Sequence, residues 1–191
     1  MTSSPGGFPD AGAWQMRVAP DEVDAVQVGP PFDRFYVREY AGLVALAYSL
    51  TGSRAHAEDT AQEAMLVAFR RWDEVCRLEM PPLWVRRVCA NLSTSFVRRR
   101  VTEARAVLRL HALPSQVAEL DYDDGAFWSA VRRLPRRQAQ CIALSYVYGC
   151  PVAEVAAVLG CAEGTVKVHL SRGRSRLAAR LGEEQADGSE R

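Results

Sequence analysis

Apolar side chains recur at intervals of three and four residues over most of this chain, and no segment alternates as a strand does. A period near 3.6 predicts amphipathic helices, so we expect an all-α protein. In the first half, the pattern predicts helices over residues 32–51, 54 to about 72 and roughly 83–105. Ser53 suits the cap of the second helix, and residues 73–82, which end in two prolines, predict a loop. The apolar positions that carry these patterns are Phe32, Phe35, Tyr36, Leu43, Val44, Ala47, Leu50, Ala57, Ala61, Met65, Ala68, Trp72, Val85, Val88, Leu92 and Phe96.

The clearest pattern lies near the end of the chain, where two short helices follow one another. Pro151 suits the first position of a helix that carries apolar residues on one face up to Leu159, and Gly160 suits its left-handed end. A second apolar stripe starts after a short polar turn. Its members, at intervals of four, three, four and four, are Val166, Leu170, Gly173, Leu177 and Leu181. Two helices joined by a glycine-containing turn make a helix-turn-helix.

The second of these helices carries only basic charge, because no acidic residue lies between Gly164 and Gly182. At 100° per residue, the face opposite the apolar stripe holds Thr165, Val168, Ser171, Arg172 and Ser175, with Lys167 and Arg174 at one edge and Arg176 at the other. An exposed valine on such a face suits a thymine methyl group in a major groove. We therefore expect a DNA recognition helix, and the alternative is an amphipathic helix with a solvated basic face.

Charge along the chain is segregated although the net charge is only +1. Residues 84–110 hold seven arginines and one glutamate, and residues 132–180 hold nine basic and two acidic side chains. Two cationic segments on an acidic remainder predict two contacts with a polyanion, and the acidic parts suit a protein partner.

Two small helical domains joined by a flexible acidic linker account for this organisation. The expected divisions are a flexible segment over 1–30, a first domain over 31–106, a linker over 107–125, a helix-turn-helix domain over 126–182 and a flexible tail over 183–191. No run of eighteen apolar residues predicts a membrane span, and the N-terminus lacks the pattern of a secretory signal, so we expect a cytoplasmic protein without membrane insertion. Reduced, mostly buried thiols are expected, with a zinc site or a redox switch as the alternative, for Cys76, Cys89, Cys141, Cys150 and Cys161.

Two stretches carry a resemblance to a known family. Residues 43–72, "LVALAYSLTGSRAHAEDTAQEAMLVAFRRW", resemble domain 2 of bacterial sigma factors of the extracytoplasmic-function (group 4) class. Residues 134–177, which contain "AAVLGCAEGTVKVHLSRGRSRL", resemble domain 4 of the same family. The resemblance implies an alternative sigma factor that binds core RNA polymerase, recognises the −35 and −10 promoter elements and promotes DNA opening. It also implies an anti-sigma factor as a further partner, and neither a cofactor nor catalysis by the chain.

The resemblance assigns roles to particular residues. Asp59, Gln62, Glu63 and Leu66 share one face of the second helix, opposite its core side, and correspond to the family's surface for the clamp helices of the polymerase. The alternative is a solvated acidic face. The −35 element corresponds to Thr165, Lys167, Val168, Ser171, Arg172 and Arg176.

The third helix corresponds to the part of the family that opens the −10 element. Trp84, Arg86, Arg87 and Asn91 lie where contacts to the non-template strand are expected, and Arg98, Arg99 and Arg100 where duplex phosphates are expected. Trp84 suits the core equally well, and the three arginines also suit a solvated helix end. The family often has serine, which caps the recognition helix, where this chain has Ala162. Loss of such a cap costs about 1 kcal/mol of stability.

Two other classes of function compete with this interpretation. His56, Asp59 and Glu63 have a spacing that can present metal ligands on one helix, but no second set completes an enzyme site. A conventional helix-turn-helix regulator would also contain "TVKVH", yet it would normally carry a sensing domain, and the helical N-terminal half does not resemble one.

Overall fold

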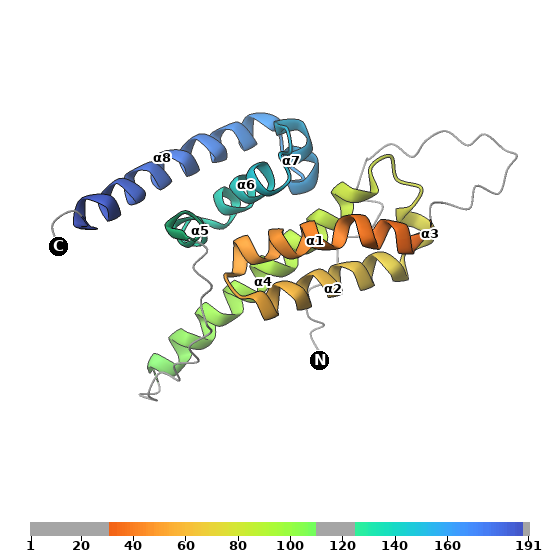
Figure 1. Cartoon of the computed structure of the whole chain (residues 1–191), viewed down its shortest axis with the longest axis horizontal. Coiled ribbons are helices and arrows are strands. Elements are labelled where there is room, and N and C mark those ends of the chain that lie inside the picture. Colours follow the sequence, from red (N-terminus) through yellow and green to blue (C-terminus); the bar gives the residue numbers. More distant parts are fainter. Residues whose placement is uncertain (1–30, 110–124, 189–191) are drawn as a thin grey trace, which may run out of the picture.

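The computed structural model describes residues 31–109 and 125–188, and of residues 96–109 and 183–188 it describes the backbone alone. Within these ranges the chain forms eight helices and no sheet, which confirms the all-α class (Figure 1). The expected flexible N-terminal segment, most of the acidic linker and the end of the tail lie outside the described residues. None of the helices in the described part of the chain is long and apolar enough to cross a bilayer.

The first unit, residues 31–109, is built on three helices: α1 (Phe32–Thr51), α2 (Arg54–Arg70) and α4 (Pro81–Arg109). The first ends as predicted, because Gly52 adopts the left-handed conformation at φ 74°. Ser53 then caps α2 by accepting a hydrogen bond from the backbone N–H of His56. Four of the five residues expected to face inward from the second helix are buried: Ala57, Ala61, Met65 and Ala68. The fifth, Trp72, is half-buried and lies in the next helix, α3 (Trp72–Val75), because α2 ends at Arg70.

The core side of α4 differs in part from the prediction. Val85 is fully buried as expected, but Val88 and Leu92 are only half-buried. The core is filled instead by Trp84, Cys89 and Ala90, together with the buried hydroxyl of Ser93, which donates to a carbonyl one turn earlier. The buried face of α4 is therefore rotated from the predicted one: Cys89 donates to the carbonyl of Leu43 in α1, and the carbonyl of Ala90 accepts from Gln140 in α6 (Arg136–Val147).

The predicted loop over residues 73–82 is wrong at both of its ends. A short helix, α3 (Trp72–Val75), occupies its start, and α4 begins at Pro81. Two adjacent prolines suit the first turn of a helix, where backbone N–H groups have no partner within the helix and a φ near −65° is already helical. Only residues 76–80 connect the two helices.

The second unit, residues 125–188, contains α5 (Gly125–Arg132), α6 (Arg136–Val147), α7 (Val152–Leu159) and α8 (Glu163–Gly188). The helix-turn-helix is confirmed: Gly160 ends α7 at φ 62°, and α8 starts three residues later. The helix α8 continues beyond Gly182, where its end was expected. A single glycine weakens a helix but ends it only in another conformation, and Gly182 does not have a positive φ.

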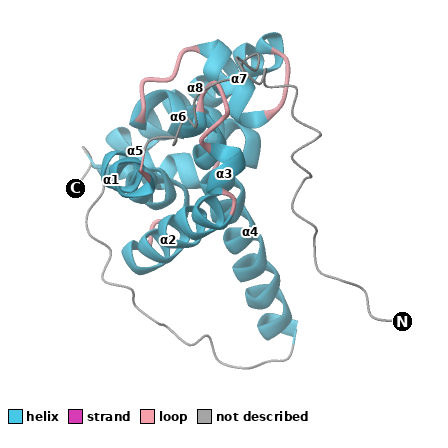
Figure 2. Cartoon of the chain, turned by 90° about the vertical axis from the view of Figure 1, so that its right-hand side faces the viewer, coloured by secondary structure: helices cyan, strands magenta, loops and turns pink. Residues whose placement is uncertain are grey.

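The two units pack against each other, although the sequence suggested only tethered domains. Helices α5 and α6 contact α1, and α7 contacts α4. Figures 1 and 2 both show the second unit lying over α1 and the first half of α4. Buried apolar residues of the two units accordingly form one continuous core.

Candidate nucleic-acid and protein interfaces

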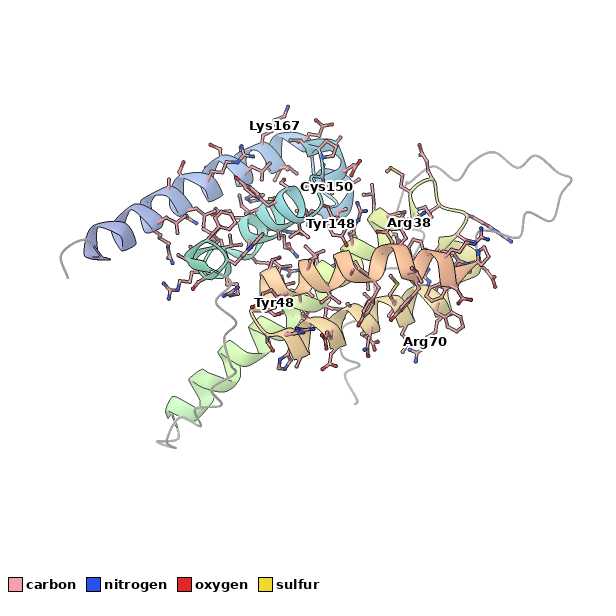
Figure 3. All side chains as sticks on the ribbon, viewed as in Figure 1. Arg38, Tyr48, Arg70, Tyr148, Cys150 and Lys167 are labelled. Carbon is pink, nitrogen blue, oxygen red and sulfur yellow. The ribbon has the colours of Figure 1, made fainter. Side chains whose placement is uncertain are left out.

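The first turns of α8 present a polar and basic face to solvent. Val166 is fully buried, whereas Val168, two residues further on, is 45% exposed. Thr165, Lys167, Ser171 and Arg172 are exposed as well, and Lys167 points away from the body of the molecule (Figure 3). Arg176, at the edge, is held by a hydrogen bond from Nη1 to Oε1 of the buried Gln138, at 3.0 Å. The structure thus brings the predicted recognition residues onto one open face.

The start and the middle of α8 fix this face in position. The carbonyl of Ala162 accepts from the N–H groups of Thr165 and Val166, at 2.9 and 3.2 Å, but alanine has no side-chain oxygen to cap a further donor. Gly173 lets α8 approach α6 closely, because a Cβ atom there would lie 3.2 Å from Cγ1 of Ile142. A rigid support of this kind suits a helix that must enter a groove.

A groove with acidic and apolar walls runs between α1 and α2. The four predicted residues of α2, Asp59, Gln62, Glu63 and Leu66, are all exposed along it, and its volume is about 550 Å³. Gln62 donates to the hydroxyl of Tyr40 at 3.5 Å. The remaining lining residues are Phe32, Tyr36, Met65 and Phe69.

Phe69 was not among the predicted site residues, although it is 59% exposed in this groove. Its ring contacts that of Phe32, with centroids 5.1 Å apart. Residues 59, 62, 66 and 69 follow the three-and-four spacing of one helical face, so the sequence contained the signal. Exposed aromatic surface beside carboxylates is typical of a protein-binding surface.

Of the third predicted set, on α4, the residues whose side chains the structure describes do not lie on an open surface: Trp84 is buried, and Arg86, Arg87 and Asn91 are half-buried. Trp84 is only 8% exposed, and the guanidinium of Arg71 lies 5.7 Å from its ring centroid. In this structure Trp84 is therefore a core residue. Arg86 donates from Nη2 to Oε2 of Glu39 at 3.2 Å, and its guanidinium lies 4.0 Å from the ring centroid of Tyr148. Asn91 accepts from Nη2 of Arg136 at 3.2 Å. Arg98, Arg99 and Arg100 belong to α4, but their side chains lie outside the described residues.

The electrostatics of this region follow from burial. The pKa of Arg87 is lowered to about 10, mainly by burial and in part by the charge of Arg137, while Cys161 acts in the opposite direction. Burial also raises the pKa of the Tyr148 hydroxyl, and the neighbouring charge of Arg86 offsets only part of that rise. Arg86 and Arg87 of α4 therefore lie in a partly desolvated contact.

In the described part of the chain, the histidine and cysteine residues do not gather into a metal site. His56 Nδ1 lies 2.8 Å from Oγ of Ser53 at the start of α2, and no three His, Cys, Asp or Glu side chains come together there as a metal site would require. All five cysteines are free thiols; Cys89, Cys141 and Cys150 are buried.

Comparison with known proteins identifies the family. The family profile described as Sigma-70 region 2 matches residues 35–102, and that described as Sigma-70, region 4 matches residues 124–177. The ECF RNA polymerase sigma factor EcfG of Rhodopseudomonas palustris (strain TIE-1) is 33% identical over 153 residues, covering 78% of this chain and 82% of that protein. The ECF RNA polymerase sigma factor SigM of Mycobacterium tuberculosis (strain ATCC 25618 / H37Rv) is 30% identical over 152 residues, covering 79% and 77%.

Solved structures agree with the sequence matches. The sigma factor RpoE from Bartonella quintana, crystallised with the anti-sigma factor NepR, is 29% identical with a TM-score of 0.61, covering 79% of this chain and 96% of that one. CnrH, in complex with the cytosolic domain of CnrY, shares the fold at 21% identity and a TM-score of 0.59, covering 80% and 88%. Two helical units, one of which carries an exposed recognition helix, are typical of a DNA-binding protein that acts in transcription. Its matches to both sigma-70 regions and to these relatives show that the chain belongs to the ECF sigma factors, and it serves RNA polymerase as an alternative sigma factor in transcription initiation.

Proposed function

We propose that this sigma factor reads the −35 element with α8, binds the polymerase clamp with the groove of α1 and α2, and engages the opened −10 strand with α4. The observation that carries the proposal is the recognition face of α8. It is exposed and free of acidic residues between Gly164 and Gly182, while the opposite face is anchored in the core by Val166, Leu170 and Leu177. A helix of this kind fits the major groove and the phosphates beside it.

Base reading falls to the residues at the centre of the face. Val168 offers an apolar contact for a thymine methyl group, and Arg172 offers the paired donors that guanine accepts. Thr165, Lys167, Ser171 and Arg176 surround them, and we assign them to phosphate and sugar contacts that set the position of the helix.

The clamp surface is the groove that contains Asp59, Gln62, Glu63 and Leu66. Carboxylates around exposed apolar side chains suit a basic, helical partner, because the apolar centre supplies affinity and the charges supply orientation. Phe69 extends the apolar centre of this surface. We add it to the polymerase-binding set.

The −10 surface is α4, with Arg86, Arg87 and Asn91 for the non-template strand and Arg98, Arg99 and Arg100 for upstream phosphates. Cationic and amide side chains along one helix suit a single-stranded backbone and unstacked bases. Trp84 would have to leave the core to stack on a base, so we assign its present position to support of α4.

Regulation by an anti-sigma factor is part of the proposal. The solved relative RpoE was crystallised with the anti-sigma factor NepR. We propose a partner of the same class for this chain, acting in the cytoplasm where the polymerase is. The chain itself would perform no covalent chemistry and use no cofactor.

Run-off transcription tests the proposal directly. The purified chain would be added to bacterial core polymerase with a library of genomic promoters, and specific transcripts are expected only when the chain is present. Their start sites would give the −35 and −10 sequences together. Absence of both transcripts and polymerase association, with DNA binding retained, would favour the conventional helix-turn-helix regulator instead.

A further inference from the structure

The helices α6 and α8 approach closely around Gly173, which lies one turn before Arg176. A Cβ atom on Gly173 would lie 3.2 Å from Cγ1 of Ile142 and 3.6 Å from Cβ of Gln138. Figures 1 and 2 both show α6 beside α8, and the two helices contact each other. Side chains of α6 can therefore reach the edge of the recognition face.

One of these side chains holds a cation of that face. Gln138 is 6% exposed, and its Oε1 accepts a hydrogen bond from Nη1 of Arg176 at 3.0 Å. Arg176 is exposed, so the bond joins a fixed acceptor in the core to a charged group at the surface. A guanidinium carries five N–H donors, and one bond leaves the others for a second acceptor.

The other cations of the recognition face are not held in this way. Within the described part of the chain, no hydrogen bond joins the side chains of Lys167, Arg172 or Arg174 to another residue. All three are exposed, and Lys167 points away from the body of the molecule (Figure 3). A long cationic side chain without a partner samples many rotamers, and ordering it on a phosphate costs conformational entropy. For Arg176 much of this cost is met before DNA binds.

We propose that Gln138 is a positioning residue for promoter DNA: it holds the guanidinium of Arg176 at the edge of the recognition face, where the free donors meet a phosphate of the −35 duplex. Gln138 is buried and acts on DNA only through Arg176. The inference rests on the proposed role of α8 in reading the −35 element. Phosphate contacts of this kind set the register of a recognition helix on the duplex.

The chemistry of glutamine suits this role. An amide oxygen accepts a hydrogen bond from the guanidinium without adding negative charge, so Arg176 keeps its attraction for phosphate. A carboxylate at the same position would hold the guanidinium more strongly, but it would neutralise the charge that phosphate needs. A neutral acceptor fixes the cation and leaves its charge available.

The experiment measures binding of the full chain to two labelled duplexes by fluorescence anisotropy at several salt concentrations. One duplex carries a −35 sequence read from the run-off promoters, and the other carries the same bases in scrambled order. Gln138→Met removes the acceptor oxygen and keeps a side chain of similar length. Gln140→Met is the matched control, because Gln140 is also buried on α6 but its amide donates to the carbonyl of Ala90 in α4.

Gln138→Met should weaken binding to both duplexes equally, by roughly twofold to tenfold, the effect of having to order one long side chain. Its salt slope should stay that of the natural chain, because the charge of Arg176 is still present. Arg176→Ala should weaken binding and also lower the magnitude of the slope by about one. Gln140→Met should bind both duplexes like the natural chain.

The double variant separates positioning from a general role in packing. If Gln138 acts through Arg176, Gln138→Met should cause no further loss of affinity in the Arg176→Ala chain, whereas a packing role would give additive losses. Thermal unfolding checks that each variant is folded. If Gln138→Met does not fold, Gln138→Asn takes its place, because the shorter side chain keeps an amide but withdraws it from Arg176.

Four results would each overturn the proposal: natural affinity in Gln138→Met, additive losses in the double variant, an equal loss in Gln140→Met, or a loss confined to the −35 duplex. The last would mean that Gln138 acts through base reading. Failure of the natural chain to bind either duplex would instead overturn the proposed role of α8. The two failures are distinguishable, because in the first the natural chain binds DNA and only the coupling between residues 138 and 176 is missing.

Discussion

At the scale of single residues, position on a helix decides whether the same side chain builds the core or meets a partner. Val166 and Val168 are chemically identical and lie within one turn of α8, but the first is fully buried and the second is 45% exposed. The sequence predicted this difference from spacing alone, because a rotation of 200° separates the two. The identity of the base that Val168 meets stays a prediction.

Replacement of Arg172 by alanine should weaken initiation at −35-dependent promoters. Loss of one arginine that contacts a base edge costs about 1–3 kcal/mol, so a loss of promoter affinity between roughly fivefold and 150-fold is expected. Promoter binding by the polymerase complex, measured by fluorescence anisotropy, would show it. Arg54→Ala, an exposed arginine at the start of α2, serves as the control. If Arg172→Ala also loses core polymerase, the assignment of this face is wrong.

Thiol reactivity should divide the cysteines into two groups. Burial raises the pKa of Cys89 and of Cys141 to about 12, so near pH 8 almost none of either thiol is the reactive thiolate. Both are also fully buried, whereas Cys76 and Cys161 are half-buried. Alkylation of the folded chain at pH 8 should therefore modify Cys76 and Cys161 first, and all five after denaturation. Rapid labelling of Cys89 in the folded chain would contradict this packing.

At the scale of the element, α2 combines two tasks on opposite faces. Small residues such as Ala57, Ala61 and Ala68 allow close packing on the inner side, and the outer side carries the groove with its carboxylates and Phe69. The sequence predicted both faces from one period. It did not predict that α1 supplies the other wall, because periodicity does not say which helix lies beside which.

Phe69→Ala should reduce the affinity for core polymerase without unfolding the chain. An exposed aromatic residue at the centre of a protein interface typically contributes more than 1 kcal/mol, so an affinity roughly five times weaker is expected. Val37→Ala is the matched control, because Val37 is 80% exposed on α1 and does not line the groove. Titration of labelled chain with core polymerase measures both variants, and thermal unfolding monitors their stability. Equal affinities for the two variants would remove Phe69 from the polymerase surface.

At the scale of the whole molecule, packing of the units changes which charges are available. Two cationic segments are evident in the sequence. Among the side chains that the structure describes, the proposed DNA-binding residues of the first segment (Trp84, Arg86, Arg87 and Asn91) are buried or half-buried, whereas those of α8 are exposed. Without polymerase, the chain should therefore bind duplex DNA through α8 alone.

The salt dependence of that binding counts the cations involved. About four cations on α8 (Lys167, Arg172, Arg174 and Arg176) predict a slope of log affinity against log salt concentration between about −3 and −4. Anisotropy of a labelled −35 duplex at several salt concentrations gives the slope, and Lys167→Ala should reduce its magnitude by about one. A much steeper slope for the natural chain would mean that the arginines of α4 also reach the duplex.

The sequence by itself determined the helices, the helix-turn-helix and the outward faces of α2 and α8, since these depend on residues three or four apart and on local end signals such as Gly52 and Gly160. Tertiary structure alone decided which side chains of α4 are buried and which are exposed. It placed Trp84 in the core and covered Arg86, Arg87 and Asn91. The covering partners lie far along the chain: Asn91 meets Arg136, 45 residues away, and Arg86 meets Cys150, 64 residues away. Contacts at such separations follow from how whole helices pack and from glycines that allow close approach, and helical periodicity contains neither.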